Sequence, residues 1–155
     1  MDLRPELLPP QIEQQRINEI SAEIGRIADM IHTGRRGEAD PAIVAIARFN
    51  AASGRDYGPA DFLEYDGWRT LEEFALEAAR PAWPKVEDVS RAELAEIVRR
   101  IQAADPETDY YLLLLQANTP HPHAGALIFH PPPDLADASA ERIVDAALAY
   151  HPVAL

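Results

Sequence analysis

The sequence has no cysteine among its 155 residues. A disulfide framework, a thiolate zinc site and a cysteine nucleophile are therefore excluded. A glycine-rich phosphate loop is also absent, because the G-R-R-G stretch at 34–37 has no preceding strand and no Lys-Ser/Thr ending. The functional groups that remain as candidates are carboxylates, histidines, aromatic side chains and charged surface residues.

Long apolar runs are missing as well. The run at 110–115 is far too short to span a bilayer. The first residues lack the basic and apolar stretches of a secretory signal peptide. We therefore expect a cytoplasmic protein.

Positive charge is scarce, and the formal net charge is −12. Residues 1–85 hold 10 basic and 15 acidic side chains, and residues 86–155 hold 4 and 11. Such a surface repels phosphate backbones, so we expect no direct binding of nucleic acid. It attracts basic proteins and speeds their encounter. The alternative is that the acidity only keeps the protein soluble.

Two stretches of the chain look like copies of one unit. S-A-E-I-G-R-I at 21–27 is echoed by R-A-E-L-A-E-I at 91–97. Each stretch begins the same order of predicted segments: a long amphipathic helix, a second helix, a short irregular segment and a last helix. A proline-rich linker at 81–85 separates them. We predict two units, at 12–81 and 88–152.

Helix signals recur throughout the first unit. A stripe at steps of three and four predicts the first helix, formed by Ile17, Ile20, Ile24, Ile27 and Ile31. Asp40 and Pro41 start a second helix, whose buried side is expected to hold Ile43, Val44, Ala47 and Phe49. Thr70 and Glu73 form a capping box for another helix.

The second unit repeats this plan. Ser90 and Glu93 form a capping box, and Asp105-Pro106 repeats the start seen at Asp40-Pro41. The run at 110–115 has the composition of a buried strand, but its flanking cap favours a helix. Eight helical segments without a convincing strand predict an all-α protein built as two tandem small four-helix bundles.

Histidines and carboxylates offer two candidate chemistries. His121, His123 and His130 have spacing that could hold a divalent metal, or they are loop residues that cap and pack. Asp105, Glu107 and Asp109 favour a helix N-terminus or form an acidic docking surface. Catalysis by a pair of carboxylates needs one of the two to be desolvated, and nothing in the sequence suggests an apolar cleft around these residues. We expect no metal, no cofactor and no enzymatic activity.

Several aromatic side chains lie where loops or short turns meet helices. Amphipathic aromatics surrounded by acids anchor protein interfaces, although each could instead fill a gap under its own loop. They are Tyr57, Tyr65, Trp68, Phe129 and Tyr150.

The second unit resembles a known family. H-P-H-A-G-A-L-I-F-H-P at 121–131 is similar to the third-helix signature of the colicin and pyocin immunity proteins, roughly H-P-x-x-[ST]-D-L-I-Y-Y-P. S-A-E-R-I-V at 139–144 resembles the family's S-P-x-G-I-V, and the likeness covers about residues 88–150. The resemblance implies a small acidic four-helix protein that binds a nuclease bacteriocin and blocks it beside its active site.

The resemblance also implies contact residues. Toxin-selecting positions on the second helix would correspond to Asp105, Asp109, Leu112 and Gln116, and the family's tyrosine pair to Phe129 and His130. In the first unit, D-F-L-E-Y at 61–65 aligns with D-L-I-Y-Y, so Asp61, Glu64 and Tyr65 form a better-preserved contact surface on a diverged copy.

Three hypotheses follow. The first is an immunity-like protein that inhibits a basic nuclease toxin. The second is a structural or regulatory interaction protein that kept the fold and lost toxin binding, which the altered pair Phe129 and His130 favours. The third is a metal-dependent enzyme that uses the three clustered histidines.

Overall fold

The computed structural model describes residues 1–33, 40–67 and 69–151. Gly34, Gly37 and Trp68, which entered the sequence analysis, lie outside the described residues. Within the described ranges the secondary structure consists of α-helices and short 3-10 helices, with no strand. The prediction of an all-α protein is confirmed.

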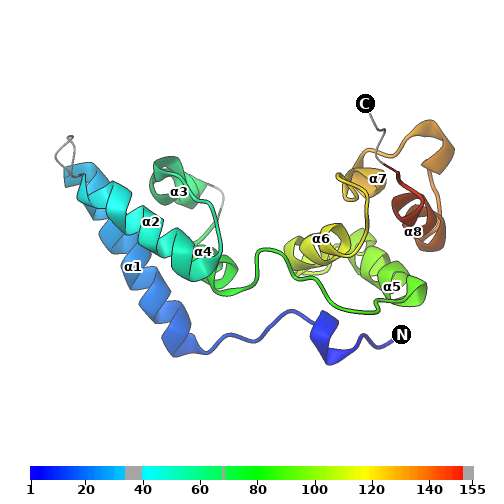
Figure 1. Cartoon of the computed structure of the whole chain (residues 1–155), viewed down its shortest axis with the longest axis horizontal. Helices are drawn as coiled ribbons and strands as arrows, with labels where there is room; N and C mark the ends of the chain where they lie inside the picture. The colour runs from blue at the N-terminus through cyan, green and yellow to red at the C-terminus, as the bar shows by residue number, and fades with distance from the viewer. Residues whose placement is uncertain (34–39, 68, 152–155) are drawn as a thin grey trace. The chain divides into compact units, whose positions relative to one another are not determined.

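The chain divides into two compact units. The N-terminal unit is Pro10–Ala82, and the C-terminal unit combines Met1–Pro9 with Trp83–Leu155 (Figure 1). The α-helices of the N-terminal unit are α1 (Gln14–Thr33), α2 (Pro41–Ser53), α3 (Pro59–Glu64) and α4 (Leu71–Ala79), with the 3-10 helix η2 at Tyr65–Gly67. Those of the C-terminal unit are α5 (Arg91–Gln102), α6 (Thr108–Ala117), α7 (Ala126–Phe129) and α8 (Ala140–Leu148), with η1 at Pro5–Leu7 and η3 at Pro133–Leu135.

The helices α2 and α4 begin where the capping signals predict, whereas α6 begins at Thr108 and not at the predicted Asp105-Pro106 start. The Asp40 carboxylate accepts a hydrogen bond from the Ala42 N–H at 2.9 Å, and Pro41 occupies the first turn of α2. Thr70 and Glu73 form the reciprocal capping box of α4. A capped first turn satisfies backbone donors that have no partner inside the helix. These starts are therefore determined locally.

Aromatic rings fill the core of the N-terminal unit. Phe74 is fully buried, and its ring centroid lies 5.5 Å from Phe62, 5.0 Å from Tyr57 and 5.5 Å from Tyr65. Phe49 joins the same group at 5.3 Å from Phe62. Tilted and edge-on pairs at these separations add to the stabilisation from burial alone.

The predicted buried side of α2 is wrong except at Phe49. Ile43 is 63% exposed and Val44 is 50% exposed, and Ala47 is also exposed. The buried stripe is instead Ala42, Ile46 and Phe49. Because α2 has apolar residues around nearly its whole circumference, periodicity alone could not select the buried face. The large Phe49 ring selects it by joining the aromatic core.

In the C-terminal unit, α5 packs against both α6 and α8. Ser90 and Glu93 form the predicted capping box of α5. The run at 110–115 is helical and lies within α6, as predicted. Leu114 and Leu115 are fully buried, which explains why this helix has the composition of a buried strand.

Residues 1–9, which we call the N-terminal clip, belong to the core of the C-terminal unit. Leu7 is fully buried and Leu3 is 6% exposed, in the same cluster as Leu94. The Arg4 Nε donates to the Glu93 carboxylate at 2.7 Å, and Figure 1 shows the N-terminus beside α5. Hydrogen bonds from the Ser90 N–H and from Arg4 lower the pKa of Glu93. This attachment has no local signal in the sequence and was not predicted.

The C-terminus of α5 holds an alanine in a left-handed conformation. Ala104 has a φ of 57°, and its N–H donates to the Ile101 carbonyl while the Asp105 N–H donates to the Arg100 carbonyl. This is the Schellman arrangement, in which the left-handed position usually carries glycine. The methyl group of Ala104 therefore adds local strain.

We expect Ala104→Gly to raise the free energy of unfolding by about 0.5–1 kcal/mol, since relief of the strain exceeds the added freedom of the unfolded chain. Urea denaturation measures this change. Ala103→Gly is the matched control, because Ala103 has a φ of −81° and gains nothing from glycine. Equal effects of the two variants would contradict the argument.

Candidate protein-binding site

An open pocket of about 550 Å³ lies between α6 and α7 of the C-terminal unit. Apolar side chains dominate it, and imidazole and amide groups complete it. The lining residues are Leu112, Leu113, Gln116, His123, Gly125, Ala126, Phe129 and His130. Phe129 is 53% exposed, so its ring is available to a partner.

Gln116 fixes the loop that precedes α7. Its side-chain Nε2 donates to the His121 carbonyl at 2.7 Å, and its Oε1 accepts from the Ala124 N–H at 3.2 Å. Both ends of the amide are therefore used within the unit. Gln116 orients the pocket wall rather than offering a free amide to a partner.

Gly125 permits close approach of α7 to α6. A Cβ atom at this position would lie 3.1 Å from the Leu112 side chain. That separation is shorter than ordinary van der Waals contact. An alanine at this position would push the Leu112 side chain back by a few tenths of an ångström, so glycine allows its present position.

Four of the predicted contact residues meet in this pocket. Leu112, Gln116, Phe129 and His130 come from two helices and the residue that follows α7. Leu113, Gly125 and Ala126 also line this surface but were not predicted to, and His123 was predicted only as a candidate metal ligand. Their contribution depends on the packing of α7 on α6, for which the sequence carries no local signal.

Asp105 precedes α6 and Asp109 lies in its first turn, and neither residue lines the pocket. The Asp105 carboxylate accepts from the Glu107 N–H at 2.8 Å, which explains its position structurally. Asp109 is exposed in the first turn of α6. Both carboxylates contribute negative charge to the α6 end of this surface.

The three residues predicted in the N-terminal unit have different environments. The Asp61 carboxylate accepts from the Gly58 N–H at 2.8 Å and completes a capping box at the start of α3. The Tyr65 ring packs edge-on against Phe74. Glu64 is exposed on α3. Of the three, Glu64 is therefore the side chain best placed to report on binding without disturbing the fold.

A metal site is not formed in the part of the chain that the structure describes. No three histidine, aspartate or glutamate side chains gather there to hold an ion. Instead, the His121 Nδ1 accepts a hydrogen bond from the His123 N–H at 2.9 Å. The His121 ring also lies 4.8 Å from that of Tyr150. The H-P-H sequence thus forms a turn in front of α7.

Charge is unevenly distributed within the C-terminal unit. Residues 101–141 contain no lysine or arginine, although they carry six acidic side chains. The arginines of this unit's helices lie on α5 and α8, where Arg91 pairs with Asp145 at 2.7 Å and Arg99 pairs with Glu141 at 2.6 Å. The segment that forms α6 and α7 therefore presents carboxylates without fixed positive charge.

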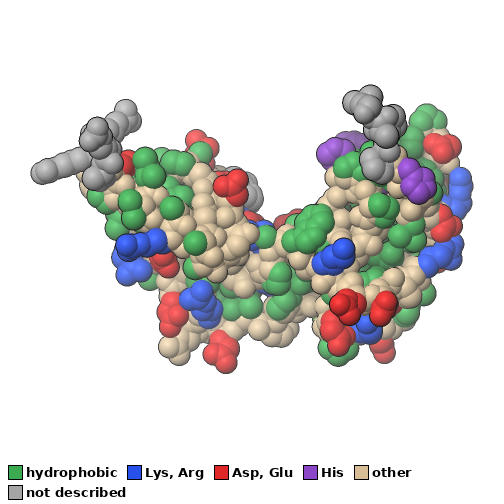
Figure 2. Space-filling model, in the orientation of Figure 1, with side chains coloured by type: hydrophobic (Ala, Val, Ile, Leu, Met, Phe, Trp, Pro, Cys, Tyr) green, Lys and Arg blue, Asp and Glu red, His purple; other side chains and the backbone are tan. Residues whose placement is uncertain are grey.

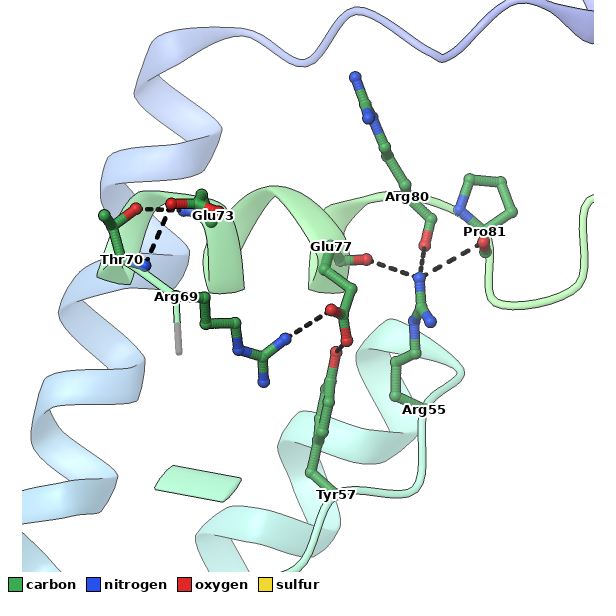
Figure 3. A network of polar contacts seen from close by, with 8 residues as sticks. All are labelled: Arg55, Tyr57, Arg69, Thr70, Glu73, Glu77, Arg80 and Pro81. Atoms are coloured by element: carbon green, nitrogen blue, oxygen red, sulfur yellow. Dashed lines mark hydrogen bonds and ion pairs between the residues drawn. The ribbon is translucent and has the colours of Figure 1, made fainter. Parts of the chain in front are cut away.

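The N-terminal unit contains a polar network that the sequence analysis missed (Figure 3). The Glu77 carboxylate accepts from the Tyr57 hydroxyl at 2.7 Å and pairs with the Arg69 guanidinium. The Arg55 Nη2 donates to the Glu77 carbonyl at 2.7 Å and to the Arg80 carbonyl at 3.2 Å, near the end of α4. Burial and the Glu77 carboxylate raise the pKa of Tyr57. These contacts join α4 to the segment after α2, and they have a structural role.

Within the described residues, no helix has the length and apolar character needed to cross a membrane. The pocket between α6 and α7 combines an apolar lining with an exposed aromatic ring, and both features are common at protein-binding surfaces.

The C-terminal unit is similar to a known family. Residues 86–152 match the family described as Colicin immunity protein / pyocin immunity protein. The match confirms the resemblance predicted for the second unit. Comparison with curated proteins and with solved structures gives no match.

Proposed function

We propose that the protein is a bacteriocin immunity-like protein that binds and inhibits a basic nuclease toxin. The main support is the α6–α7 pocket. Its lining includes the exposed Phe129, and the segment that forms it contains no lysine or arginine. This pocket lies within the residues that match the immunity family. In this proposal the protein acts as an inhibitor and not as an enzyme.

Two physical effects contribute to binding at such a surface. Asp105 and Asp109, with the net charge of −12, attract a basic partner over a distance and raise the association rate. Phe129 and Leu112 supply apolar area that excludes water once the partner has docked. Buried anchors of this kind govern the dissociation rate.

We further propose that residues 12–81 form a diverged copy of the immunity unit, with Asp61, Glu64 and Tyr65 as its contact residues. The order of helices supports this proposal, since a long helix, a second helix, a short helix and a last helix follow one another in both units.

The direct test uses the basic C-terminal domain of a nuclease toxin encoded beside this gene. We expect the purified protein to bind this domain and to inhibit its nuclease activity. Because opposite charges steer the encounter, the affinity should fall by roughly tenfold or more on moving from low to high salt. Absence of a neighbouring toxin gene, together with failure to inhibit any nuclease, would contradict the proposal.

Phe129→Ala tests the pocket itself. We expect it to weaken toxin binding by roughly 30-fold, corresponding to about 2 kcal/mol, because truncation removes the exposed ring that a partner would bury. Isothermal titration calorimetry measures the affinity. Leu148→Ala is the matched control, since Leu148 is 40% exposed on α8 and does not line the pocket. Equal losses in both variants would place the toxin elsewhere.

The alternative is a structural or regulatory interaction protein that kept the fold and lost toxin binding. Phe129 and His130, which stand where the family resemblance expects two tyrosines, favour this alternative. Replacement of Glu64 by Ala distinguishes the two, because the side chain is exposed. Reduced inhibition with unchanged stability supports toxin contact through the N-terminal unit.

A further inference from the structure

Histidines are the only side chains between residues 101 and 141 that can gain a positive charge near neutral pH. The segment contains His121, His123 and His130 and no lysine or arginine. His123 and His130 are exposed and line the α6–α7 pocket, and Figure 2 shows histidine side chains at the surface near α7. Imidazole groups ordinarily change charge between about pH 5 and 8.

The elements around the pocket supply mostly carboxylates. α6 carries Asp109, and the segment between α7 and α8 carries Asp134 and Asp137. α8, which packs against α7, carries Glu141 and Asp145, both paired with arginines of α5.

The positive charge on α8 is Arg142, whose Nη2 donates to the Asp134 carbonyl. His121 is held differently from the two pocket imidazoles, because its Nδ1 already accepts the His123 N–H. Within the pocket lining, His123 and His130 are thus the titratable groups.

We propose that protonation of His123 and His130 releases the partner from the α6–α7 pocket, which makes the complex sensitive to acid. This inference rests on the proposed function, because it requires a basic partner at this surface. It adds regulation of binding by pH, which follows neither from the fold nor from the family match.

Protonation of these histidines weakens binding through two effects. A protonated imidazole places positive charge in the lining of a surface that otherwise attracts a basic protein, so like charges meet on docking. The same imidazolium must also lose water as a partner covers the apolar lining formed by Leu112, Leu113 and Phe129. Binding therefore favours the neutral form, and by linkage the complex releases protons when it forms.

The test measures the ratio of the dissociation constants at pH 5.5 and pH 7.5 for one toxin domain. The probe is the basic nuclease domain encoded beside this gene, in a catalytically inactive form. The proteins compared are the natural protein, the double variant His123→Gln/His130→Gln, and His32→Gln. His32 is exposed on α1 of the N-terminal unit and serves as the control.

We expect the ratio to be about tenfold or more for the natural protein and for His32→Gln, and several-fold smaller for the double variant. Each ratio is internal to one protein, so a change of affinity at pH 7.5 does not affect the comparison. Equal ratios for the natural protein and the double variant would overturn the inference while leaving the proposed function intact. Absence of binding at pH 7.5 would instead overturn the proposed function.

Calorimetry of the natural protein gives a second readout that needs no variant. Titrations at pH 6.5 in buffers of different ionisation enthalpy report the protons exchanged on binding. Release of protons to the buffer supports the inference. Uptake of protons, or no exchange, contradicts it.

Discussion

Leu7→Asp will destabilise the C-terminal unit by at least about 3 kcal/mol, because it places a charge in an apolar core. Leu7 is fully buried in the cluster that also holds Val98 and Leu114. Folded domains have total stabilities of roughly 5–15 kcal/mol, so the loss is a large part of the whole. Urea denaturation followed by circular dichroism measures it.

The matched control is the next residue. Leu8 is 40% exposed, so Leu8→Asp should change the free energy of unfolding by no more than about 0.5 kcal/mol. Hydrogen exchange should show that Leu7→Asp exposes peptides of α5 and α8. If the loss appeared in α1 and α4 instead, the N-terminal clip would not belong to the C-terminal unit.

This result bears on function, because Leu7 lies far outside the residues 86–152 that match the immunity family. A fragment limited to the matched residues lacks Leu3, Arg4 and Leu7. It would therefore leave apolar core surface and Glu93 without their partners from the clip. Toxin binding should be measured with the full chain.

Phe74→Ala will destabilise the N-terminal unit by about 3–5 kcal/mol, since it removes a fully buried ring and leaves a cavity. The ring lies at the centre of the aromatic core, and the Arg69 guanidinium carbon lies 4.0 Å from its centroid. Loss of the ring therefore also removes a cation–π contact. Denaturation monitored together with hydrogen exchange of α1 and α4 peptides measures the effect.

Ile43→Ala is the control for this experiment. Ile43 is 63% exposed on α2, so its truncation should cost less than about 1 kcal/mol. The two hydrophobic clusters share no residues, and we therefore expect α5 and α8 to keep their protection in Phe74→Ala. Full toxin affinity in Phe74→Ala would assign binding to the C-terminal unit, whereas a strong loss would implicate the diverged copy.

Local signals explain which parts of the fold could be predicted. The stripe of Ile20, Ile24 and Ile27 is buried on α1 as its spacing requires. Caps at Asp40, Thr70 and Ser90 set helix starts through bonds that span only two or three residues. Interactions of such short range are present in the sequence itself.

Prediction of the candidate site was partial for a physical reason. The immunity-like signature identified Phe129 and His130, and both line the α6–α7 pocket. The aromatic residue Tyr65 fits a contact pattern by sequence, but its ring packs against Phe74 in the core. Residue type alone does not determine whether a ring points outward or inward.

The sequence by itself determined the all-α class, the capped starts of α2, α4 and α5, the negative charge and the immunity-like signature of the second unit. Only the tertiary structure decided which face of α2 is buried, how Glu77 joins Tyr57 to Arg69, and where the N-terminal clip is attached. The reason is range: caps and stripes act within one helix, whereas Arg4 reaches Glu93 across 89 residues of chain. Contacts of that separation depend on how the completed helices pack.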